Sequence, residues 1–193
     1  MKRVLVVVGA LVCLGAASAR ADTGSSHYKI ANRIAVPGDG GWDLLAVDDA
    51  AGRIFLSHGT VVQVVDEKTG QLVGTVEGMN RVHGIALVPD LKEGFATSGA
   101  DTTVVIFDLQ TLQVVKKIKV SGVNPDAILY DSASRRVFAF NGRSNNATVI
   151  DPATRAIVGS VALPGKPELP AADGRGTMFV NHRKTRLTSV SSR

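Results

Sequence analysis

The sequence holds one cysteine, few aromatic residues and no sustained helical periodicity. Cys13 is the only cysteine among 193 residues, and it lies in an N-terminal apolar stretch. Residues 22–193 therefore exclude disulfides, thiolate metal sites, cysteine nucleophiles and the C-x-x-C-H attachment of c-type haem. Aromatic residues make up 5% of the chain. Nothing in residues 22–193 repeats with the 3.6-residue period of an amphipathic helix, which argues against helical fold classes.

The first 21 residues have the three parts of a secretory signal peptide. Lys2 and Arg3 form the charged start, residues 4–17 are apolar, and Ala19–Ala21 forms an A-x-A cleavage site. The apolar stretch is too short to cross a membrane comfortably. We therefore expect residues 1–21 to be removed and the rest to be periplasmic or secreted, without a membrane span.

Positive charge is concentrated at the two ends of the chain. The formal net charge is +5, but without residues 1–21 the chain carries 19 basic and 17 acidic residues. Four of those bases lie in the last eleven residues: Arg183, Lys184, Arg186 and Arg193. Residues 22–181 are therefore nearly neutral, and the sequence offers no basic face that would bind nucleic acid.

A hairpin pattern recurs along the chain. Asp66, Asp108 and Asp151 stand 42 and 43 residues apart, and each is followed three residues later by threonine. Each lies between two β-branched runs, at residues 61–65 and 72–76, 103–107 and 114–118, and 147–150 and 157–161. The carboxylate can accept backbone N–H groups in an Asx turn, so we expect these aspartates to be structural.

Two further apolar runs precede each hairpin, so each repeat holds four short strands. Four antiparallel strands in about 42 residues match one blade of a β-propeller. A β-sandwich also has many short strands, but it would not repeat one turn chemistry at a fixed period. The sequence predicts an all-β fold and, within that class, a β-propeller.

These features resemble the YVTN-repeat β-propellers, exported proteins related to surface-layer and NHL-like propellers. The resemblance rests on the apolar-x-apolar-Asp-x-x-Thr hairpins, on Pro125-Asp126 and Pro167-Glu168, and on the Gly-Arg-Ile-Phe and Arg-Arg-Val-Phe strands. It covers residues 28–181. No Gly-His…Trp-Asp signature of a WD40 array is present. The resemblance implies blades and leaves the function open, because such families share scaffolds rather than active sites.

The pattern predicts an incomplete ring of about three complete four-stranded blades, with partial blades at both ends. Residues 28–36 are expected to be the outer strand of another blade, and a fourth blade begins at Pro167 and reaches Asn181. The complete blades are expected at residues 40–78, 82–120 and 125–163. The domain organisation is then a signal peptide (1–21), a partial propeller (22–181) and a basic, irregular tail (182–193).

The resemblance implies about seven blades, in the usual range for propellers. The loss of pattern after Asn181 suggests a longer gene truncated by a frameshift, and the alternative is a natural short tail. Further blades encoded in another frame of the downstream DNA would support the frameshift. An open ring exposes apolar blade faces, so we expect a marginal fold, aggregation, or self-association through the exposed blade edges.

Five residues near the starts of the first strands are candidates for a ligand or cation site, because these starts meet at one mouth of the central channel. They are Asp43, His83, Asn124, Asp126 and Glu168. Oxygen clusters suit Ca²⁺, and metal-dependent lactonases of similar propeller shape hold calcium with Glu, Asp and Asn at the channel mouth. The alternative is that the carboxylates cap turns and are simply solvated.

The expected function is that of an exported binding or scaffold module, with a protein or small-molecule ligand at the channel mouth. The alternative is a cation-dependent enzyme resembling a lactonase or a dehydrogenase subunit. No residue is assigned a catalytic role, and no Gly-x-Ser-x-Gly elbow is present. Trp42 is expected to pack in the core, and His58 is expected to serve a turn.

Overall fold

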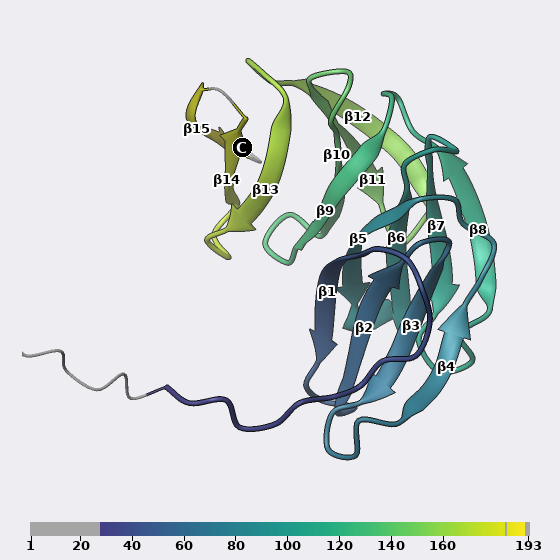
Figure 1. Ribbon diagram of the computed structural model, residues 1–193. Helices are drawn as coiled ribbons and strands as arrows, with labels where there is room; N and C mark the ends of the chain where they lie inside the picture. The colour runs from purple at the N-terminus through teal and green to yellow at the C-terminus, as the bar shows by residue number, and fades with distance from the viewer. Residues whose placement is uncertain (1–27, 184, 192–193) are drawn as a thin grey trace, which may run out of the picture. The chain divides into compact units, whose positions relative to one another are not determined.

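The protein is described by a computed structural model that covers residues 28–183 and 185–191. The predicted signal peptide lies outside the described residues. The chain divides into two compact units, Met1–Arg33 and Ile34–Arg193. Every strand of the described residues lies in the second unit (Figure 1).

The strands form four antiparallel sheets, which we call blades 1 to 4. Blade 1 holds β1 (Trp42–Asp48), β2 (Arg53–His58), β3 (Val61–Asp66) and β4 (Leu72–Val76). Blade 2 holds β5 (Val82–Val88), β6 (Glu93–Ser98), β7 (Thr103–Asp108) and β8 (Val114–Lys119). Blade 3 holds β9 (Pro125–Asp131), β10 (Arg136–Asn141), β11 (Asn146–Asp151) and β12 (Ala156–Ala162). Blade 4 holds β13 (Pro167–Ala172), β14 (Thr177–His182) and β15 (Thr185–Ser191).

These sheets confirm the predicted partial β-propeller and its three complete blades. Within a blade, each strand pairs with the next one in sequence, so each blade is an up-and-down sheet. The first strands of the blades are neighbours in space, because β1 contacts β5, β5 contacts β9 and β9 contacts β13 (Figure 1). A single 3₁₀ turn, η1 (Pro89–Leu91), is the one helical element in the described part of the chain.

Aspartate carboxylates close the hairpins between the third and fourth strands, as the sequence predicts. Asp66 Oδ1 accepts hydrogen bonds from Thr69 N (2.7 Å), Thr69 Oγ1 (2.8 Å) and Lys68 N (3.1 Å). Asp108 repeats this arrangement with Gln110 and Thr111. These bonds satisfy backbone donors that the turn would otherwise leave unpaired, so they fix each hairpin locally.

The hairpin aspartates make stability depend on pH. Hydrogen bonds from the backbone N–H of Thr69, and next from its hydroxyl, hold the pKa of Asp66 below its ordinary value, and Thr111 does the same for Asp108. A lowered folded-state pKa stabilises the fold above the unfolded pKa of about 3.9, and this stabilisation disappears as the pH falls through the folded pKa. We expect the urea concentration at the midpoint of unfolding to decrease as the pH is lowered from about 5 to about 2.

The double variant Asp66→Asn, Asp108→Asn is expected to lose part of that pH dependence, because an amide does not titrate. Asp90→Asn is the control, since Asp90 lies in η1 between β5 and β6, outside the two Asx turns. Urea titrations at several pH values measure the effect. An unchanged slope of the midpoint against pH in the double variant would contradict this role for the two carboxylates.

The core lies between the blades. At the junction of blades 1 and 2, Phe55 and Val64 pack with Val105 and Phe107, all of them buried. The next residue along β7, Ile106, points to the opposite face and packs in the junction with blade 3. Successive residues of a strand face opposite sides of the sheet, so the apolar runs of the sequence bury both faces of a blade.

Two sequence-based expectations are wrong at the ends of the propeller. Residues 28–36 form no strand, although the expected outer strand falls there. A strand needs a hydrogen-bonded partner, and the blade to which it would belong is not among the described sheets. The tail is also not irregular throughout, because β15 pairs with β14 from Thr177↔Ser191 to His182↔Thr185.

The sequence did not predict the strand β15, because most of the residues that alternate between its two faces are polar. Val190 packs against the cluster of Phe138 and Met178, and Thr188 Oγ1 lies 2.9 Å from His182 Nε2. One inward apolar residue is a weak sequence signal. The loss of pattern that motivates the truncation hypothesis is therefore smaller than the sequence suggests.

Among the described residues, no helix is long and apolar enough to span a membrane.

Candidate functional site

Three of the five candidate residues come together at the starts of the first strands of the blades, which we call the inner strands. Asp43 follows the first residue of β1, His83 that of β5 and Asp126 that of β9. His83 Nδ1 lies 2.7 Å from Asp43 Oδ2 and 3.9 Å from Asp126 Oδ1. One ligand atom from each residue lies within 4.8 Å of the others. We call these three residues the mouth cluster.

The backbone at Gly84 sets the spacing of the mouth cluster. A Cβ at Gly84 would lie 2.8 Å from both Asp126 O and Ile128 N, so β5 and β9 approach here too closely for any side chain. Thr97 Oγ1 donates to Asp126 O (2.6 Å) and accepts from Gly84 N (2.8 Å). Because Gly84 has no side chain, β5 and β9 can approach closely, and the Thr97 hydroxyl bridges them. His83 and Asp126, on these neighbouring strands, are therefore held close together.

The carboxyl of Asp126 is the electrostatically perturbed member of the cluster. Burial raises the pKa of Asp126 above its ordinary value; the carboxylates of Asp43 and Glu168 act in the same direction, and His83 and Lys166 act against it. Lys166 Nζ lies 3.1 Å from Glu168 Oε1. Desolvated carboxylates that share one site favour a bound positive charge, because it relieves their mutual repulsion.

Asn124 and Glu168 border the cluster rather than belong to it. Asn124 is buried and has a left-handed backbone, with φ of 57°. A Cβ placed on Gly99 would lie 2.9 Å from His83 Nε2 and 3.3 Å from Asn124 Oδ1, so both side chains line the space beside Gly99. Glu168, on the fourth inner strand, pairs with Lys166. The structure thus groups the five candidates as a triad with two flanking residues.

The two nitrogens of His83 have different surroundings. Nδ1 faces the two aspartates, whereas Nε2 is fully buried and forms no hydrogen bond among the described residues. The side chain as a whole is 10% exposed. The only nitrogen that a ligand at the mouth can reach is therefore Nδ1, which is already hydrogen-bonded to Asp43. The cluster thus brings one imidazole nitrogen and two carboxylates together, a donor set that a single cation can share.

Two residues near the mouth, Lys166 and Trp42, were missed or misjudged from the sequence. Lys166 was not predicted, because no repeat motif marks it. Trp42 was expected in the core, but it is 47% exposed and stacks on His58, with ring centroids 4.4 Å apart. His58 Nε2 lies 3.0 Å from Asp39 O, so this histidine anchors the loop before β1. An exposed stacked tryptophan beside the cluster could be found only from the tertiary structure.

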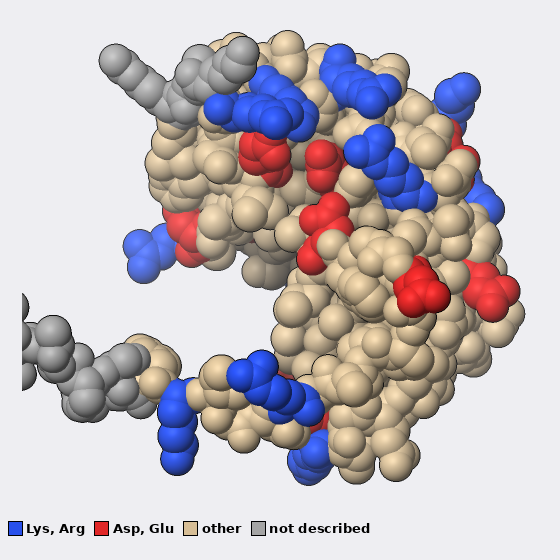
Figure 2. Space-filling view, in the orientation of Figure 1, with Lys and Arg blue, Asp and Glu red and all other residues tan. Residues whose placement is uncertain are grey.

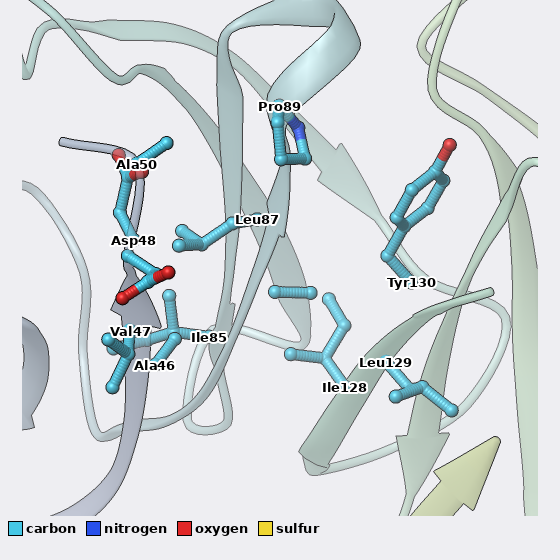
Figure 3. Close-up of a pocket in the computed structure, with 12 residues that line it drawn as sticks. Ala46, Val47, Asp48, Ala50, Ile85, Leu87, Pro89, Ile128, Leu129 and Tyr130 are labelled. Atoms are coloured by element: carbon cyan, nitrogen blue, oxygen red, sulfur yellow. The ribbon is translucent and has the colours of Figure 1, made fainter. Parts of the chain in front are cut away.

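A second hollow lies at the opposite ends of the inner strands. The pocket has a volume of about 540 Å³. Figure 3 shows the side chains of Ala46, Leu87 and Ile128 around it, with Asp48 and Tyr130 on different sides. Asp48 is engaged by Arg53 Nη2 at 2.9 Å. The lining is mainly apolar, and its residues with polar side chains are Asp48, Asp49 and Tyr130. The mouth cluster is therefore the stronger candidate site.

The charged side chains of the visible face are mixed. Figure 2 shows Lys and Arg interspersed with Asp and Glu, and no continuous basic stripe crosses this face. The picture agrees with the near-neutral charge of residues 22–181. It adds no support for a nucleic-acid partner, because such partners select clustered positive charge.

Comparison with known proteins establishes the fold alone. No protein-family model matches the sequence, and no curated protein matches it. The chain is similar to a solved chain described as Kuenenia stuttgartiensis hydrazine synthase, with a TM-score of 0.67 and 20% identity. The match covers 72% of this chain and 43% of that one, so this chain spans less than half of its length. The hydrazine synthase chain is one of 1136 solved chains that match. An architecture shared so widely serves many functions. The chain described here is a partial β-propeller.

Proposed function

We propose that the chain is an exported binding module of the YVTN-repeat type, acting in the periplasm or outside the cell. The Lys-Arg start, apolar stretch and A-x-A site at its N-terminus support export. The Asp-x-x-Thr hairpins at Asp66 and Asp108 support the repeat type, since both form the same Asx turn. A rigid scaffold that presents residues from several blades at one mouth is suited to binding.

The mouth cluster is proposed to hold a divalent cation, and the observation that carries this is its geometry. Three potential ligand atoms, from three blades, lie within 4.8 Å of one another. Small adjustments of these side chains would bring all three to about 2.0–2.2 Å from one ion. Three protein ligands leave coordination positions open, and an oxygen atom of a small molecule or partner protein would fill them.

The donor set favours Zn²⁺ or Mn²⁺ over Ca²⁺. Calcium takes six to eight oxygen ligands, whereas imidazole nitrogen suits transition metals and carboxylates suit both kinds. His83 supplies the nitrogen closest to both carboxylates. Calcium, the ion expected from the sequence, therefore serves as the comparison ion in the test.

Binding is proposed rather than catalysis because of the two environments of His83. Asp43 engages Nδ1, and Nε2 is enclosed. The nitrogen that a substrate at the mouth could reach is Nδ1, and in the proposed site its lone pair goes to the cation. A lactonase-like or dehydrogenase-subunit-like activity has no specific contact in its favour.

Mn²⁺ or Zn²⁺ at about 100 times its dissociation constant is expected to raise the melting temperature by about 5 °C or more, because an ion that binds only the folded state stabilises it. Calorimetry and thermal melting of the purified chain measure the effect. Asp126→Asn is expected to abolish the shift, since it removes one charged ligand from the cluster.

Asp90→Asn is the matched control, because Asp90 lies in η1 and outside the cluster. It is expected to keep the full shift. A metal-induced shift that is equal in Asp126→Asn and in Asp90→Asn would show that the ion binds elsewhere. The absence of any shift with Zn²⁺, Mn²⁺ or Ca²⁺ would remove the cation from the proposal.

A further inference from the structure

In the part of the chain that the structure describes, two apolar blade faces are covered by no neighbouring blade. On blade 1, Leu45 and Val47 are 60% and 51% exposed. On blade 4, Leu169, Phe179 and Leu187 are 56%, 39% and 63% exposed. The contrast with the inner junctions is clear at β7, where Ile106 and Phe107 on opposite faces are both fully buried. Contiguous exposed apolar surface of this kind marks an interaction site.

Residues 34–36 stand where the fourth strand of a preceding blade would stand. At the junction of blades 1 and 2, the hairpin residue Leu112 packs over Gly74 of the fourth strand β4. Gly70 occupies the same hairpin position in blade 1, and its closest contact is Ile34, 3.1 Å from an added Cβ. Gln63 Nε2 also donates to Pro37 O at 2.8 Å. The segment before β1 is thus laid along blade 1 as a neighbouring outer strand would be.

Among the described residues, blade 4 has no such fourth strand. Its sheet has the order β13-β14-β15, so β15 is its outer edge, whereas blades 1 to 3 each add a fourth strand at this place. An exposed strand edge is a template for another strand. The chain therefore carries a sheet that is short of one strand and, at its other end, a segment positioned as such a strand.

We propose that two copies of this chain close one ring, in which residues 34–36 of each copy complete blade 4 of the other. The open face of blade 4 in one copy then covers Leu45 and Val47 of blade 1 in its partner. Two copies contribute eight sheets, within the usual range of four to eight propeller blades. The two junctions are related by a two-fold axis, the commonest symmetry of soluble oligomers.

A second copy fits both ends at once, which is why we choose it as the occupant. Each junction needs an apolar face with an edge strand, from blade 4, and an apolar face with a spare segment, from blade 1. Every copy carries both. The closed ring buries both faces and pairs the edge of β15, so it removes the exposed features of the single copy together.

The purified full chain is expected to sediment as a dimer. Leu45→Glu on blade 1 and Leu169→Glu on blade 4 are each expected to weaken dimerisation at least about hundredfold, because each variant places a charge in both junctions. Val158→Glu, on β12, is the matched control, since Val158 is 53% exposed and lies outside both faces. All three positions are exposed in one copy, so circular dichroism is expected to show unchanged strand content.

Mixing the two variants provides the sharper test. In a mixed dimer of Leu45→Glu and Leu169→Glu, one junction carries both substitutions and the other carries neither. We therefore expect mixing to restore dimers that neither variant forms alone at that concentration. Hydrogen exchange at residues 34–36 is expected to slow with rising concentration of the unsubstituted chain, because those amides join a sheet.

Several outcomes would overturn the two-copy ring. One is that the unsubstituted chain is a monomer or a polydisperse aggregate. Others are that Val158→Glu weakens dimerisation equally, or that mixing the two variants restores no dimers. The last is a rate of hydrogen exchange at residues 34–36 that does not depend on protein concentration. A monomer whose faces are covered by further blades of a longer chain would count among them. None of these outcomes depends on a cation at the mouth cluster, so this proposal and the binding proposal fail independently.

Discussion

Replacing Gly84 with alanine is expected to lower the free energy of unfolding by about 3 kcal/mol, because the new methyl group overlaps backbone atoms. Its Cβ would lie 2.8 Å from Asp126 O and from Ile128 N, and neither backbone atom can rotate away. Relief requires β5 and β9 to separate, which strains the hydrogen bonds that Thr97 makes to both strands. Urea unfolding monitored by circular dichroism measures the loss.

The same substitution is expected to damage the mouth cluster. Separating β5 from β9 moves His83 away from Asp126, so the metal-induced rise in melting temperature should shrink along with stability. Gly159→Ala is the control, because Gly159 lies in strand β12 and its added Cβ would meet only Val149, at 3.9 Å. If both alanine variants were equally stable, the close approach of β5 and β9 would not be a constraint on the fold.

Phe107→Ala is expected to lower the free energy of unfolding by about 4 kcal/mol, in the range for a buried phenylalanine reduced to alanine. Phe107 is fully buried between blades 1 and 2, and its ring centroid lies 6.0 Å from that of Phe55. The ring lies directly over Gly94, which has no side chain to fill the space that the ring would vacate. The cavity therefore remains, and its cost adds to the lost burial.

Phe107→Leu is the control for Phe107→Ala, because leucine refills most of the volume. Its expected cost is below about 2 kcal/mol. Chemical denaturation of both variants gives the comparison. A loss below about 1 kcal/mol for the alanine variant would mean that the neighbouring blade collapses into the space, and that the blades are loosely coupled. Since typical domains have only about 5–15 kcal/mol in total, the expected loss is a large fraction of stability.

The repeated hairpins were predictable because their causes are local. The carboxylate of Asp66 and the backbone and hydroxyl of Thr69 are three residues apart, and their hydrogen bonds form within the turn itself. The same spacing at Asp108 gave the repeat its period, and the period gave the blades. The predictions for residues 28–36 and 185–191 were wrong for the opposite reason. Whether an alternating segment becomes a strand depends on a partner edge elsewhere in the fold.

The candidate site was predictable as a set of residues and unpredictable as an arrangement. Repeat position alone placed Asp43, His83 and Asp126 at the starts of successive inner strands. Nothing in their spacing indicated that His83 Nδ1 would lie 2.7 Å from one carboxylate and 3.9 Å from the other. Lys166 and the stacking of Trp42 on His58 had no signal, since each depends on how loops fold over a blade.

The amino-acid sequence by itself determined that this chain builds four-stranded β-propeller blades, because turn chemistry and strand alternation act over a few residues and recur with a fixed period. Only the tertiary structure decided which side chains meet at the channel mouth, that β15 extends blade 4, and which blade faces stay open. Those features depend on the approach of strands about 40 residues apart, such as β5 and β9 at Gly84, and on the presence of a neighbouring edge.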